Sequence, residues 1–138
     1  MRYERNENLM NHELHIDALL PVEMAVRAEQ IGVRKAAMAT VNLFALALLA
    51  GAFVALGAIF STTVAAGASG VLPYGVTRLL IGLSFCLGLI LIIVGGAELF
   101  TGNTLIVMAW ASGKVTTTAL LRNWLIVYLG NFAGALGT

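Results

Sequence analysis

The residues best suited to chemistry lie in one short stretch, GGAELFTGN, at positions 95–103 of a long apolar segment. Glu98 is the single acidic residue between positions 30 and 138, and Thr101 and Asn103 follow it closely. A carboxylate in such surroundings can bind a cation, exchange a proton or accept hydrogen bonds from free backbone N–H groups. Because an unpaired charge at membrane depth is costly, ionisable residues there mark functional sites as a rule. This stretch is therefore the first candidate site.

The rest of the sequence gives little support for an enzyme. It contains no nucleophile with a base at usable spacing, no metal-ligand cluster and no glycine-rich phosphate loop after a strand. His12 and His15 lie three positions apart, but metal sites usually need three or four ligands. We therefore expect surface histidines, no catalytic residues, no metal and no cofactor.

Composition places the chain in a membrane. Hydrophobic residues make up 59% and charged residues 11% of the sequence, whereas soluble domains carry about 25% charged residues. Mean hydropathy is +0.91. The net charge of +1, with no cluster of cations, argues against a nucleic-acid partner. We expect an all-α protein embedded in the lipid bilayer of the inner (plasma) membrane.

The N-terminal part is the most polar. Residues 1–16 predict a mobile tail, and residues 17–37 predict an amphipathic helix with Asp17 as its cap and Pro21 in its first turn. Glu23 and Arg27 have the spacing of an ion pair along a helix. This helix is either a solvated lead into the membrane or a cytoplasmic surface helix that could cover a pore entrance.

Residues 39–138 predict a membrane domain. Its first span covers about 39–60, a loop with a tight turn follows at 61–76, and another span covers 118–138. Small residues recur every four positions in the first span, and the last span holds a GxxxG pair, so both spans require close helical neighbours. These residues are Ala47, Gly51 and Ala55, with Gly130 and Gly134. Basic residues before the first span, and at Lys114 and Arg122, predict a multi-pass topology with a cytoplasmic N-terminus.

The middle span is too long for one crossing. Residues 77–111 form a predominantly apolar run of 35 residues, but a crossing needs about 20 residues. We therefore expect a span broken near 95–103, where non-helical backbone must be shielded by protein or must line a water-filled cavity. The residues of this broken-helix loop are Gly95, Gly96, Glu98, Gly102 and Asn103. The alternative is a polar kink in a continuous helix, with Glu98 facing a neighbouring subunit.

Bulky apolar residues near the break could form a constriction. Phe85 and Leu89 lie one helical turn apart, and their shared face either lines a constriction or meets lipid. Phe100 lies inside the break, where lipid exposure explains it less well. Glu98 either caps loose N–H groups or pairs with a cation elsewhere.

The strings ELFTGN and RNWLIVYLGNFAG, with ASGK between them, closely resemble the formate/nitrite transporter family, which includes formate, nitrite and hydrosulfide channels. The resemblance runs from about Pro21 to Thr138. It implies that three spans, the second broken by a loop, form half of an aquaporin-like six-span inverted repeat, and that the full-length protein is a homopentamer with one pore per subunit. It also implies that Glu98 interacts with a cation of the other half. The pore and constriction residues that it implies are Phe85, Leu89, Leu99, Phe100 and Thr101.

The function implied is a channel or proton-linked transporter for small monovalent anions of weak acids, with formate as the first expectation and nitrite or hydrosulfide as alternatives. The family's second half supplies a pore histidine and a lysine that this sequence lacks. Because the sequence stops as its third span finishes, a truncated fragment or assembly subunit that does not transport is a further alternative.

Overall fold

The computed structural model describes residues 20–138, and every regular element within them is a helix. The predicted tail at 1–16, the proposed cap Asp17, and His12 and His15 lie outside the described residues. The helices are α2 (Pro21–Ala36), α3 (Thr40–Ala68), α4 (Tyr74–Val94), α5 (Phe100–Asn103), α6 (Ile106–Ala111) and α7 (Thr117–Leu136).

Helix α2 begins at Pro21, and Leu20 takes the N-cap position that we predicted for Asp17. The Glu23 carboxylate accepts a hydrogen bond from the Leu20 backbone N–H at 3.0 Å. It therefore satisfies a free donor at the helix start, and no ion pair joins it to Arg27 in this part of the chain.

Helix α3 is longer than the predicted first span, so the loop predicted for 61–76 is wrong over its first half. The hydroxyl groups of Ser61, Thr62 and Thr63 donate to backbone carbonyls of the preceding turn at 2.8–3.0 Å. These hydrogen bonds within the helix satisfy the polar side chains, so the chain can remain helical there. The turn itself occupies residues 69–73, with Gly70 at a φ of 77°.

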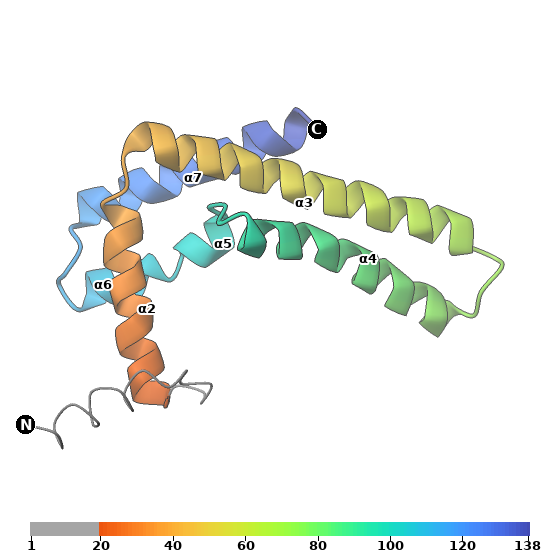
Figure 1. Cartoon of the computed structure of the whole chain (residues 1–138), viewed down its shortest axis with the longest axis horizontal. Helices are drawn as coiled ribbons and strands as arrows, with labels where there is room; N and C mark the ends of the chain where they lie inside the picture. Colours follow the sequence, from red (N-terminus) through yellow and green to blue (C-terminus); the bar gives the residue numbers. More distant parts are fainter. Residues whose placement is uncertain (1–19) are drawn as a thin grey trace, which may run out of the picture.

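Helix α3 is the central element, packed between α4 and α7 (Figure 1). A Cβ atom at Gly51 would clash with the α7 backbone at Asn131, and one at Gly134 would clash with the α3 backbone at Leu48. The predicted requirement for close helical neighbours is thus confirmed for α3 and α7. Gly57 and Gly88 allow a similar approach between α3 and α4.

Within residues 20–138, two helices, α3 and α4, are by length and composition able to cross a membrane. Large apolar side chains remain exposed along both, as expected for helices surrounded by lipid. Helix α2 runs across one end of this arrangement, while α5 and α6 continue the path of α4 toward that end (Figure 1). At that end, a small hydrophobic core joins α2, α6 and α7. Its residues are Ala36, Ile106, Ala109, Val115 and Leu120.

Candidate functional site: the joint between two half-helices

Helix α4 ends at Val94, and helix structure resumes only at Phe100. We call the non-helical residues 95–99 the joint. Gly96 has a φ of 61°, a conformation that glycine adopts without strain, and the Ala97 N–H donates back to the Ile92 carbonyl at 3.0 Å. A continuous kinked helix would have neither the five non-helical residues nor a positive φ at Gly96. Gly95, Gly96 and Glu98 lie in the joint, whereas Gly102 and Asn103 lie in α5.

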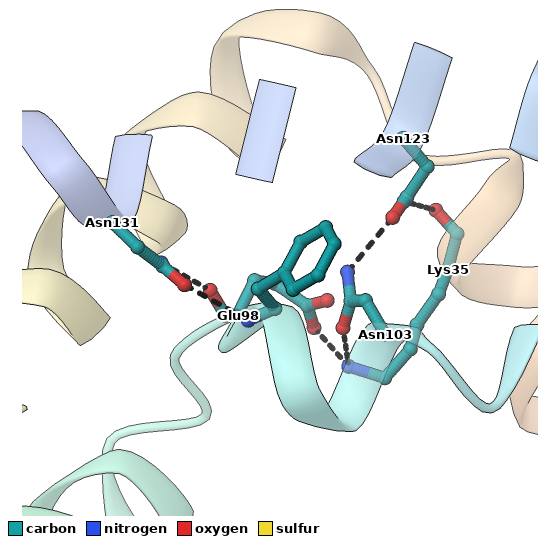
Figure 2. A network of polar contacts seen from close by, with 6 residues as sticks. Lys35, Glu98, Asn103, Asn123 and Asn131 are labelled. Carbon is teal, nitrogen blue, oxygen red and sulfur yellow. Dashed lines mark hydrogen bonds and ion pairs between the residues drawn. The ribbon is translucent and has the colours of Figure 1, made fainter. Parts of the chain in front are cut away.

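Asn131 of α7 holds the joint against α3 (Figure 2). Its side-chain oxygen accepts the Phe100 N–H at 2.8 Å. Its amide nitrogen donates to the carbonyl of Ala47 at 2.7 Å and to that of Glu98 at 3.0 Å. The Glu98 N–H donates in turn to the Leu46 carbonyl at 3.2 Å. The Phe100 and Glu98 N–H groups and the Glu98 carbonyl therefore find partners on other helices, as unwound backbone requires in a bilayer.

The Glu98 carboxylate pairs with Lys35 of α2. The Lys35 ammonium nitrogen lies 2.6 Å from Glu98 Oε1, and it also donates to Asn103 Oδ1 at 3.1 Å (Figure 2). Glu98 is 5% exposed, whereas a quarter of the Lys35 side chain remains accessible. Of the two roles left open for Glu98, the structure therefore shows the cation partner, and within residues 20–138 this cation is Lys35.

Two buried asparagines extend the pair into a network (Figure 2). Asn103 donates to Asn123 Oδ1 at 2.9 Å, and Asn123 donates to the Lys35 carbonyl at 3.0 Å. Both asparagines are fully buried. Glu98 Oε2 is buried without a hydrogen-bond partner among the described residues. The network thus fixes the C-terminal end of α2, the joint, α5 and α7 relative to one another.

A largely apolar cavity of about 330 Å³ adjoins the joint. Three aromatic side chains, Phe100, Tyr128 and Phe132, line it. Phe100 contacts Tyr128, and also Trp124 outside the lining, edge to face, with ring centroids 5.8 and 6.2 Å apart. The Trp124 indole N–H donates to the Asn103 carbonyl at 2.9 Å, which fixes that ring. The lining residues are Gly51, Val54, Leu99, Phe100, Thr101, Tyr128, Asn131, Phe132 and Ala135.

The structure brings together only part of the predicted constriction. Leu99, Phe100 and Thr101 all line the cavity. Phe85 and Leu89 are about half exposed on α4 and do not line it.

Sequence reasoning missed Lys35, Asn123 and Asn131 as site residues. The two asparagines carried a usable signal, since they lie eight positions apart on one face of an otherwise apolar helix. Polar residues in such helices bond across to neighbouring helices. Lys35 carried no such signal, because it is one of several basic residues in a surface helix.

Comparisons with known proteins bear on this arrangement. Residues 22–138 match the model of a family described as formate/nitrite transporter. Formate channel FocA of Escherichia coli (strain K12) is 48% identical over 120 residues, which are 87% of this chain and 42% of that protein. FocA of Haemophilus influenzae is 43% identical over 126 residues, 91% of this chain and 44% of that protein. An uncharacterized transporter of Bacillus subtilis, YrhG, is 40% identical over 120 residues, 84% and 44% of the two chains. The chain spans less than half the length of these relatives.

Proposed function

The chain belongs to the formate/nitrite transporter family, and from this premise we propose that it contributes to a pore for small monovalent weak-acid anions, with formate as the preferred one. Two of the relatives carry the name formate channel, which supports formate over nitrite and hydrosulfide.

The observation that carries this proposal is the joint. Non-helical backbone is tolerated at membrane depth only where protein shields it or where it lines a cavity. Here Asn131 and the Leu46 carbonyl satisfy its backbone, and a cavity opens beside Leu99, Phe100 and Thr101. Such discontinuous helices form the transport sites of many membrane transporters.

The proposed architecture has three crossings, formed by α3, by α4 with α5 and α6, and by α7. It corresponds to one half of an aquaporin-like inverted repeat that assembles as a homopentamer in the inner membrane. The N-terminus and α2 lie on the cytoplasmic side, because basic residues concentrate at that end. Phe85 and Leu89 line the pore if further helices of the assembly cover their face of α4.

The mechanism follows from the cost of moving a charge past apolar side chains. Formate is charged at neutral pH, and the aromatic wall at Phe100 cannot replace its hydration. A proton taken from the aqueous phase at one side, and returned to water at the other, gives neutral formic acid for the crossing. For this neutral form Leu99 and Phe100 are a much smaller barrier, and the Thr101 hydroxyl is a hydrogen-bond partner. Lys35 and Glu98 neutralise each other, so the pair adds little net electric field to the pathway. Its role in this mechanism is to hold the joint in place.

Flux measurements test the proposal. Proteoliposomes made with the complete product of this gene should take up formate faster than empty vesicles, and nitrite and hydrosulfide measured in parallel rank the three anions. Formate uptake no faster than in empty vesicles would refute the proposed function.

Cysteine labelling locates the pathway. The chain has one cysteine, Cys86, so Cys86→Ser gives a cysteine-free background. In this background, a water-soluble anionic thiol reagent should block formate flux through Thr101→Cys and leave Ser69→Cys in the α3–α4 turn unaffected. Leu89→Cys in the same background tests whether the face of α4 that carries Phe85 and Leu89 lines the pathway, in which case the reagent should also block flux through this variant. Equal block of the Thr101 and Ser69 variants would contradict a pathway at the joint.

A further inference from the structure

A cationic hollow lies beside α2, and it shares no residue with the cavity at the joint. Its volume is about 340 Å³. Arg27, Gln30 and Arg34 are three and four positions apart, so they share one face of α2, and Lys114 approaches from the turn between α6 and α7. Val33 completes the lining. Every charged side chain that lines the hollow is a cation.

Among the residues that the structure describes, the charge of this hollow is only partly compensated. Lys114 pairs with the Glu29 carboxylate, and this contact joins α2 to the turn before α7. The carboxylate of Glu23, the other acid of α2, accepts a hydrogen bond from the Leu20 N–H. Within residues 20–138, neither Arg27 nor Arg34 forms an ion pair. Two exposed guanidinium groups on one face therefore remain available to an anion.

The position of α2 indicates the source of that anion. Figure 1 shows α2 across the end of the bundle, which is along the membrane surface if α3 and α4 cross the bilayer. Tight packing of Gly32 against Ile106 and Ala109 holds it there. On either side of the face that carries the arginines, α2 exposes apolar side chains that suit the boundary between headgroups and acyl chains. These are Val22, Met24, Val26 and Ile31.

We propose that the hollow formed by Arg27, Gln30, Arg34 and Lys114 binds the phosphate group of an anionic phospholipid. Guanidinium groups present paired N–H donors that match two oxygens of a phosphate. Basic pockets at the cytoplasmic side of membrane helices bind lipid headgroups in this way. The neighbouring apolar side chains of α2 favour a lipid over free phosphate, because they would contact the acyl chains. This site does not depend on the anion that is transported.

Native mass spectrometry of the purified protein in detergent tests this site, with titration by phosphatidylglycerol, phosphatidylcholine or inorganic phosphate. Phosphatidylglycerol should bind more tightly than phosphatidylcholine. The double substitution Arg27→Gln with Arg34→Gln should weaken phosphatidylglycerol binding roughly 25-fold, at about fivefold for each charge near the surface.

Two controls keep the test decisive. Arg78→Gln removes an exposed cation at the start of α4 and should leave lipid binding unchanged. Arg27→Lys with Arg34→Lys keeps both charges and should retain most of the affinity. Equal binding of the two lipids, unchanged binding in the double glutamine variant, or displacement of the lipid by an equal concentration of inorganic phosphate would overturn the proposal.

Discussion

The chain interrupts its helices at the turn of residues 69–73 and again at the joint of residues 95–99, and the two breaks are built differently. The turn is exposed, and its backbone bonds are local, such as those from the Val71 and Leu72 N–H groups to the Ala68 carbonyl. The joint contains the buried Ala97 and Glu98, and its bonds reach residues of three other helices: Lys35, Leu46 and Asn131.

This difference teaches what a break inside a helical layer requires. At the turn, water can satisfy any backbone group that the chain leaves free. At the joint, a buried backbone group without a local partner needs one from elsewhere in the fold, since an unsatisfied buried polar group costs about 1–3 kcal/mol. The joint should therefore be sensitive to substitutions far away in sequence, and the turn should not.

The largest effect is expected from Lys35→Met, which leaves the Glu98 carboxylate buried without its cation. Breaking a buried pair costs about 3–5 kcal/mol, and the lower end applies because Lys35 is partly exposed. The free energy of unfolding in detergent measures this cost. Adding Glu98→Gln to Lys35→Met removes the stranded charge and should recover part of the loss.

Arg78→Met near the turn is the matched control, because it removes an exposed cation and should change stability by no more than about 0.5 kcal/mol. If Lys35→Met and Arg78→Met proved equally mild, the pair would not hold the joint.

A smaller effect is expected from Gly51→Ala, with Gly67→Ala as its control on the same helix. A Cβ at residue 51 would press on the α7 backbone at Asn131 and shift the side chain that holds the joint. Overpacking of this kind costs roughly 1–3 kcal/mol. Gly67 lies near the turn with open space around it, so alanine there should stabilise the helix by up to about 1 kcal/mol. Thermal unfolding of both variants measures the difference, and equal shifts would contradict it.

The smallest effect concerns pH and lies away from both breaks. The hydrogen bond from the Lys114 ammonium, followed by one from Ser112, holds the pKa of Glu29 below its ordinary value of 4.5. A lowered folded-state pKa stabilises the fold above pH 4.5, and this contribution disappears as pH falls through the folded-state value. The melting temperature of the wild type should therefore drop more below pH 4.5 than that of Glu29→Gln. Parallel curves would show that Glu29 makes no such contribution.

Family membership and the need for an interrupted middle span could be predicted from the sequence. The family match confirms the predicted family membership. The interrupted span is predicted by the excess length of residues 77–111 and by the glycines within them. The extent of α3 could not be predicted from its hydroxyl residues, because the same side chains suit a loop or a helix that accepts their hydrogen bonds.

The partners of the joint were beyond sequence reasoning for a different reason. Lys35 and Glu98 are 63 positions apart, and only the placement of α2 against α6 and α7 brings them together. Periodicity placed Phe85 and Leu89 on one face but could not say what that face meets. The structure leaves them exposed, and only the cysteine experiment assigns them a role.

Solid-state NMR of the isotope-labelled protein in lipid bilayers tests the joint most directly. The account predicts non-helical backbone shifts for Gly96–Leu99 between helical Ile93 and Gly102, with a cross-peak between Lys35 Nζ and Glu98 Cδ. Helical shifts through the whole segment, with no contact between these two side chains, would contradict it.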